Sequence, residues 1–110
     1  MNDSEFESRA EQVLARLEAA LEASGADLDW ERAGGGILEI EFADGSRMVV
    51  NRHGAAREMW VAARSGGFHF RWDGQRWVDT RSGAELFGRL TQLVGEQAGV
   101  PVRIAVEDCG

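Results

Sequence analysis

Apolar residues recur at helical spacing near the beginning of the chain. They lie three or four positions apart and share one helix face: Phe6, Ala10, Val13, Leu14, Leu17 and Leu21. Asn2, Asp3 and Ser4 offer N-caps, and residues 4–7 (Ser-Glu-Phe-Glu) have the form of a capping box. Gly25 supplies a stop. The pattern therefore predicts an amphipathic helix that begins near Ser4 and ends before Gly25.

Six shorter stretches beyond Gly25 have the alternation or the composition of strands. Asp44-Gly45 and Asp73-Gly74 are signals of tight turns, and Gly66-Gly67 marks a third connection. Short turns of this kind join antiparallel neighbours. The sequence thus predicts an antiparallel meander with strands at residues 27–31, 37–42, 47–51, 58–63, 68–72 and 76–79.

A second helix follows the meander. Residues 82–85 (Ser-Gly-Ala-Glu) form another capping box, and Gly99 and Pro101 end the segment. Its apolar face consists of Leu86, Leu90, Leu93 and Val94. Residues 102–106 fit either a short last strand or an ordered tail. Two helices on one face of an antiparallel sheet make a two-layer α+β sandwich. We expect a single domain over residues 1–110, with residues 105–110 as a tail.

The excess negative charge is confined to the first third of the chain. The formal net charge is −7, and residues 1–31 hold nine acids against Arg9 and Arg16, which already gives −7. The ten acids and ten arginines of residues 32–110 cancel. This balance argues against a nucleic-acid partner, because phosphates require basic surfaces. Charges that served only to solvate the surface would be spread over the whole chain, so this one-sided distribution indicates a further role.

Other features of the composition indicate a cytoplasmic protein. The acidic N-terminus does not resemble a signal peptide, and no apolar run approaches the ~18–20 residues of a membrane helix. Cys109 is the single cysteine, so no intrachain disulfide can form. A reducing compartment fits this cysteine usage best.

Carboxylates gather on the first helix and the strand that follows it. At ~100° per residue, the glutamates of the helix fall within an arc of ~60° beside its apolar stripe, and the acids of the strand alternate, so they project together. We call the seven the acidic ridge: Glu7, Glu11, Glu18, Glu22, Asp27, Asp29 and Glu31. Such a surface suits hard cations, bound weakly because no pocket fixes their geometry. A solvated surface without a ligand is the alternative.

Known metal and catalytic motifs do not match. Residues 27–31 begin like a calcium-binding loop, but Arg32 stands where that loop needs glycine and Leu38 where it needs glutamate. His53 and His69 lie in no recognisable catalytic motif. Trp60 alternates with Met59 and Val61, so it emerges on the open side of the sheet if those two pack under the helices. A core position is the alternative for Trp60.

Four segments together resemble the bacterial frataxin (CyaY) family. They are MNDSEFESRAEQVLARLE, GGILEIEFADGSRMVVNR, MWVAARSGGFHF and DTRSGAELF, and the resemblance spans roughly residues 1–104. It implies two helices on one side of an antiparallel sheet. It also implies a non-enzymatic protein of iron–sulfur cluster assembly that binds ferrous and ferric iron weakly on the acidic ridge.

The resemblance further implies protein partners. These are a cysteine desulfurase, which the protein would regulate with iron donation as a further role, and the iron–sulfur scaffold protein; the protein itself would be a monomer that can oligomerise with iron. The partner-binding residues would be Glu18, Glu22, Asp27, Asp29, Asn51, Arg52 and Trp60.

The chain departs from the family pattern at a few positions. Alanines at Ala19, Ala20 and Ala23 stand where relatives often carry acids, which would lower the capacity for iron, and His53 stands where glutamine is common. Two other functions remain open. One is an acidic adaptor that binds proteins and meets iron only incidentally. The other is a ferroxidase-like enzyme, which needs a fixed site with histidine or bridging glutamates.

Overall fold

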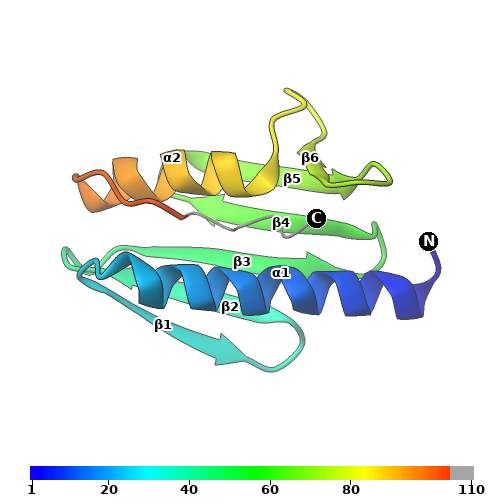
Figure 1. Ribbon diagram of the computed structural model, residues 1–110, viewed down its shortest axis with the longest axis horizontal. Coiled ribbons are helices and arrows are strands. Elements are labelled where there is room, and N and C mark those ends of the chain that lie inside the picture. Colours follow the sequence, from blue (N-terminus) through cyan, green and yellow to red (C-terminus); the bar gives the residue numbers. More distant parts are fainter. Residues whose placement is uncertain (105–110) are drawn as a thin grey trace.

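Two helices cover one face of a six-stranded antiparallel sheet in the computed structural model, which describes residues 1–104 (Figure 1). The predicted α+β sandwich is confirmed. The strands pair in chain order, each with the next. The elements are α1 (Asp3–Ser24), β1 (Leu28–Ala33), β2 (Ile37–Phe42), β3 (Arg47–His53), β4 (Glu58–Ala63), β5 (Gly66–Trp72), β6 (Trp77–Asp79) and α2 (Leu86–Ala98).

The core lies between the sheet and the two helices. All six apolar residues that predicted α1 are buried there, opposite alternate strand residues such as Leu38, Ile40 and Met59. The helices run side by side in the same direction, and the chain beyond α2 returns between them (Figure 1). Val102 and Ile104 of that segment are buried, and it forms no strand as far as residue 104. It is thus the ordered tail of the two alternatives; residues 105 and 106 lie outside the described part.

The N-terminus of α1 uses the first of the three predicted N-caps. Asn2 is the N-cap, because its side-chain oxygen accepts from the backbone N–H of Glu5 at 2.8 Å. Asn2 is a residue type that N-caps favour. The capping box predicted for residues 4–7 is wrong, because Ser4 already lies inside the helix. Gly25 ends the helix in the left-handed conformation, as predicted. The first strand begins at Leu28, so Asp27 precedes it in the connection.

The N-terminus of α2 also differs from the prediction. Glu85 is the N-cap, and its carboxylate accepts from the N–H groups of Phe87 and Gly88 at 2.8 and 3.0 Å. Ser82 instead accepts from the N–H of Ala84 in the preceding turn. A carboxylate at this position also faces the positive end of the helix dipole. The helix consequently starts three residues later than the capping box indicated.

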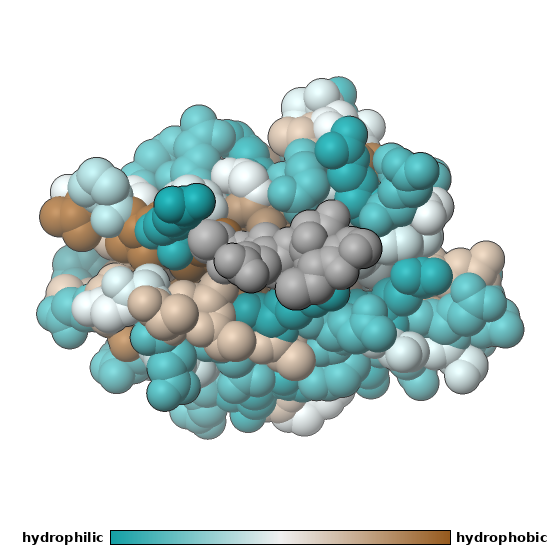
Figure 2. Space-filling view, viewed as in Figure 1, coloured by the Kyte–Doolittle hydropathy of each residue, from teal (hydrophilic) through white to brown (hydrophobic). Residues whose placement is uncertain are grey.

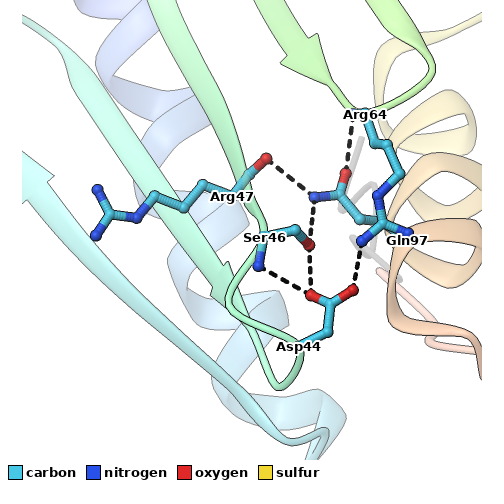
Figure 3. Close-up of polar contacts among 5 residues, drawn as sticks. All are labelled: Asp44, Ser46, Arg47, Arg64 and Gln97. Carbon is cyan, nitrogen blue, oxygen red and sulfur yellow. Dashed lines mark hydrogen bonds and ion pairs between the residues drawn. The ribbon is translucent and has the colours of Figure 1, made fainter.

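A polar network fastens the end of α2 to two turns of the sheet (Figure 3). The buried Gln97 donates to the hydroxyl of Ser46 at 3.0 Å and to the carbonyl of Arg47 at 2.9 Å, and it accepts from the N–H of Arg64 at 3.1 Å. Asp44 accepts from Ser46 and from Arg64. The hydrogen bonds from Ser46, and that from Arg64, lower the pKa of Asp44 to about 2. Gln97 thereby satisfies three polar groups from two turns.

The uncovered face of the sheet contains one buried carboxylate. Glu58 of β4 accepts from the indole N–H of Trp60 at 2.9 Å and from Arg71 at 3.1 Å. Only 7% of the surface of Glu58 is exposed to solvent. Burial alone would raise the pKa of Glu58, but the two hydrogen bonds outweigh it, and the pKa lies below the ordinary value of 4.5. Glu58 therefore ties neighbouring side chains together as an ionised group.

Within residues 1–104, neither helix combines the length and the hydrophobicity that crossing a membrane requires.

Replacing Gln97 with leucine should lower the free energy of unfolding by about 1–3 kcal/mol, because part-buried backbone groups of Arg47 and Arg64 would lose their partner. Urea denaturation measures the change. The matched control is Gln92→Leu on the same helix, where the residue is exposed. Equal losses in the two variants would contradict a fastening role for Gln97.

Acid should destabilise the wild type more than a Glu58→Gln variant. The folded-state pKa of Glu58 is depressed, so its ionised form stabilises the fold above about pH 4.5, and this contribution is lost as the pH falls through the folded pKa. Unfolding free energies measured between about pH 6 and 3 should therefore converge for the two proteins. Parallel curves over that range would show that Glu58 is not the responsible group.

Candidate functional site

The glutamates of α1 form one flank of the helix, beside β1. The helix turns its apolar stripe toward the sheet, which places Glu7, Glu11, Glu18 and Glu22 at the edge of that stripe. Glu18 is half-buried and the other three are exposed. Hydrophilic surface covers much of this side of the molecule, and hydrophobic surface gathers at the end of the molecule where α2 ends (Figure 2). We call the four glutamates the helix flank.

Arg32 of β1 neutralises the middle of the helix flank. Its guanidinium donates to Glu18 at 2.7 Å and to Glu11 at 2.6 Å. The hydrogen bond from Arg32 lowers the pKa of Glu11. Sequence analysis treated these two glutamates as open ligands, whereas the structure gives them a common cation. The long sequence separation of Arg32 from both glutamates concealed this pairing.

The ends of the helix flank have no such counter-ion. Within residues 1–104, Glu7, Glu22 and Asp27 take part in no ion pair, and all three are exposed. Glu22 lies in the last turns of α1, and Asp27 follows in the connection to β1. These carboxylates have the accessibility that a cation from solvent requires.

Asp29 and Glu31 lie on the opposite side of β1. Leu28, Trp30 and Arg32 face the helices, so the intervening acids project from the uncovered face of the sheet. The β1–β2 register sets Asp29 opposite Glu41 and Glu31 opposite Glu39. We call these four the sheet patch. The ridge predicted as one surface is therefore divided between the two sides of the edge strand.

Sequence reasoning missed half of the sheet patch. The alternation in residues 37–42 already placed Glu39 and Glu41 on one face, but their alignment with the acids of β1 depends on the hairpin register. Arg47 of β3 is the neighbouring cation, with contacts of 3.6 Å to Glu39 and 3.4 Å to Glu41. The four acids and Arg47 line a shallow hollow of about 160 Å³ together with Trp30.

Neither group of carboxylates forms a closed metal cage. Among the described residues, no three His, Cys, Asp or Glu side chains converge as a preformed metal centre. Carboxylate oxygens are nevertheless the ligands that hard cations prefer. The arrangement can attract such an ion and let it exchange, and it cannot impose a coordination geometry.

Trp60 lies on the uncovered face between two imidazole rings. Its ring stacks on His53 at a centroid distance of 3.8 Å and on His69 at 4.4 Å, with interplanar angles of 8° and 10°. Met59 and Val61 point into the core, which confirms the predicted orientation of Trp60. The two histidines, which matched no catalytic motif, cover the indole faces and leave it half-buried.

Asn51 and Arg52 point to different sides of the sheet. Asn51 pairs with Trp60 across β3 and β4 and shares its uncovered face. Arg52 alternates with Asn51 and lines a hollow with Phe6 and Glu7 on the helix side. The sheet-surface group that the resemblance implied is therefore reduced to Asn51 and Trp60, and Arg52 lies with the helix flank.

Comparisons with known proteins agree with this architecture. The sequence model of the frataxin-like domain matches residues 1–100. A protein of Dechloromonas aromatica named iron–sulfur cluster assembly protein CyaY is 65% identical over 99 residues, which cover 90% of this chain and 94% of that protein. A protein of the same name from Cupriavidus taiwanensis is 48% identical, and the aligned part covers 90% and 92% of the two chains.

Solved structures show the same likeness. Frataxin from Psychromonas ingrahamii superposes with a TM-score of 0.87 at 32% identity, over 96% of this chain and 99% of that one. The trimeric frataxin of Saccharomyces cerevisiae, complexed with ferrous, has a TM-score of 0.66 at 24% identity, over 90% and 88% of the two chains, and supports the fold alone. Fold, family model and close relatives agree with the resemblance read from the four sequence segments, and this chain belongs to the frataxin-like family.

Proposed function

We propose that this protein acts in iron–sulfur cluster assembly, where it binds iron weakly on its carboxylate surfaces and regulates a cysteine desulfurase. The curated relatives named for cluster assembly, at up to 65% identity over most of the chain, support the process. The carboxylate surfaces support the proposal that the protein binds a cation. Iron donation to a scaffold protein is the further role that this reading includes, and no catalytic role is proposed.

The observation that carries the proposal is the pairing of like charges across β1 and β2. Asp29 faces Glu41, and Glu31 faces Glu39, in two alternate positions of the ladder that share one face of the sheet. Like charges directly opposite each other destabilise a sheet by up to ~1 kcal/mol per pair. Arg47 offsets part of this repulsion at 3.4–3.6 Å. A bound divalent or trivalent cation would remove the remainder, so the strain favours binding.

Weak and exchangeable binding follows from the geometry. The exposed carboxylates of Glu7, Glu22 and Asp27 keep their water until an ion arrives, and the ion keeps part of its own shell. Glu11 and Glu18 become ligands only when Arg32 is displaced. The seven acids of the acidic ridge are therefore not seven equivalent ligands for iron. We infer that Asp29 and Glu31 bind together with Glu39 and Glu41.

Features of the uncovered face of the sheet support the proposal that a protein partner binds there. It carries acids on β1 and β2 and the half-buried Trp60 in the middle of the sheet. A basic partner surface laid across the strands would meet both the charge and a large aromatic side chain, the combination that anchors many interfaces. Asn51 stands beside Trp60 and offers its side-chain amide. We propose this face, with Glu22 and Asp27 at its border, as the desulfurase contact.

The acidic adaptor without physiological iron delivery is the second candidate. The ion pairs of Arg32 favour it, because they occupy two of the carboxylates that the family resemblance assigns to iron. An adaptor requires a negative surface, but it does not require unpaired carboxylates that could bind a metal. Iron binding and partner binding must therefore be tested separately.

Two arginine variants should locate the iron. Arg32→Gln releases Glu11 and Glu18, and Arg47→Gln releases Glu39 and Glu41, with the same change in net charge. Iron on the helix flank should bind about tenfold more tightly to Arg32→Gln and hardly differently to Arg47→Gln, because removing a competing charge-assisted contact is worth about 1.5 kcal/mol. Iron on the sheet patch should give the reverse. We expect the result that places iron on the sheet patch. The affinities are measured by anaerobic titration with ferrous ion, followed by NMR line broadening.

Equal affinities in wild type and both variants would contradict carboxylate binding at either group. Broadening centred on His53 and His69 would do the same, because imidazoles would then be the ligands. Thermal unfolding of each variant without metal serves as the control for folding.

Partner binding should separate into a charge-dependent and an aromatic contribution. Reversing Glu22, Asp27 and Asp29 to lysine should abolish desulfurase binding, since like charges facing each other at an interface cost several kcal/mol. Wild-type binding should weaken as salt rises, because screening acts over ~8 Å at physiological ionic strength. Trp60→Ala should weaken docking by ~2 kcal/mol or more while leaving the salt dependence unchanged.

The control for charge is Glu96→Lys, an exposed acid on α2 outside both carboxylate groups. It should bind the desulfurase as wild type does. Circular dichroism verifies the fold of each variant before affinity is measured at two salt concentrations. Tight binding by the triple-lysine variant would exclude the acids as the docking surface.

A further inference from the structure

The flank of α1 opposite the helix flank carries two arginines, and the exposed Glu5 lies on it one turn before Arg9. Arg9 and Arg16 are two turns apart, and at ~100° per residue they lie ~150–180° from the centre of the helix flank. The apolar stripe separates the two flanks on the sheet side. The same rotation of α1 that presents acids to β1 therefore presents two guanidiniums toward β6 and α2.

These arginines line a cleft of about 430 Å³ between α1, the β5–β6 turn and the beginning of α2. Arg76 of the turn is the third basic residue of its lining. The volume lies in the range of small-molecule sites. Trp72 and Trp77 form apolar walls, with rings in edge contact at 5.7 Å between centroids. The cleft thus combines three guanidiniums with rigid aromatic surface.

The arginines of the cleft have no carboxylate paired with them in the part of the chain that the structure describes. Within residues 1–104, the side chains of Arg9, Arg16 and Arg76 form no ion pair or hydrogen bond with a carboxylate, whereas Arg32, Arg47, Arg57, Arg64 and Arg71 do. Arg9 instead lies over the ring of Trp72, at 4.3 Å from its centroid. That contact holds the guanidinium in place without neutralising it.

Two acids lie near the cleft, and backbone groups engage both. Glu85 lines it, but both of its oxygens accept N–H groups of α2. Asp73 accepts from the N–H groups of Gln75 and Arg76, each at 2.9 Å. These carboxylates partly offset the field and leave an excess of positive charge. The acidic ridge lies across the helix, and salt screens charges over ~8 Å.

We propose that this cleft binds a compact anion that carries two or more carboxylate or phosphate groups. Guanidiniums pair with both kinds of oxyanion through parallel hydrogen bonds. Three of them around one space favour a multivalent anion over a monovalent one. The aromatic walls exclude water from one side and strengthen these contacts. The site is separate from the proposed iron surfaces and does not depend on them.

Calorimetric titration of the full-length, metal-free protein with citrate and with pyrophosphate tests the proposal. At least one should bind with one-to-one stoichiometry and shift NMR signals of residues 9–16, 72–77 and 85–87. Arg16→Gln and Arg76→Gln should each weaken binding about tenfold, because each removes a charge-assisted contact. Arg103→Gln, an exposed arginine outside the cleft, should change affinity less than about twofold.

The comparison of the two anions identifies the chemistry. Tighter binding of citrate assigns a carboxylate ligand, and tighter binding of pyrophosphate assigns a phosphate ligand. Acetate binding as tightly as either would overturn the multivalent site, as would wild-type affinity in both cleft variants or NMR shifts elsewhere. Because neither iron nor the desulfurase is present, failure here leaves the proposed function untouched, and the reverse also holds.

Discussion

The apolar stripe of α1 fixes the direction of every charged side chain on that helix. Its residues, from Phe6 to Leu21, pack against the sheet with almost no exposure, and burial of this area outweighs any preference of the charges. Rotation of the helix is therefore not free. With the stripe on the sheet, the glutamates must border β1 and the arginines must border the cleft beside α2. Hydrophobic packing thus sets the electrostatics of the whole helix-bearing side.

Pleating has the same effect on the sheet. Each residue that β1 contributes to the core commits its neighbour to the uncovered face, so Asp29 and Glu31 are separated from the helix flank although they follow it closely in sequence. Arg32 returns to the helix side and binds Glu11 and Glu18. The edge strand consequently has one side on which the charges are paired, toward the helices, and one side on which like charges face each other, on the uncovered face. Like charges persist on the uncovered face, where Arg47 contacts Glu39 and Glu41 but, within residues 1–104, no ion pair reaches Asp29 or Glu31.

The sequence predicted what depends on periodicity and missed what depends on register or local competition. Helices, strands and the placement of Trp60 on the uncovered face follow from spacing. Spacing left open which polar residue caps each helix. Asn2, one of three candidates, caps α1, whereas Glu85 caps α2 in place of Ser82. The pairing of Arg32 with Glu18 and the four-acid patch around Glu39 require contacts between segments. No spacing rule within one element contains them.

Opposite charges on the two flanks of α1 also limit how the molecule can bind more than one ligand. The acids of the helix flank and the arginine cleft lie on opposite sides of the helix, so ligands bound at the two places would not compete for the same side chains. A partner docked on the uncovered face would contact Trp60 and the sheet patch while leaving the cleft open on the helix side. The two-layer architecture thereby gives one small domain three independent surfaces, each defined by which side of the core its residues were forced to take.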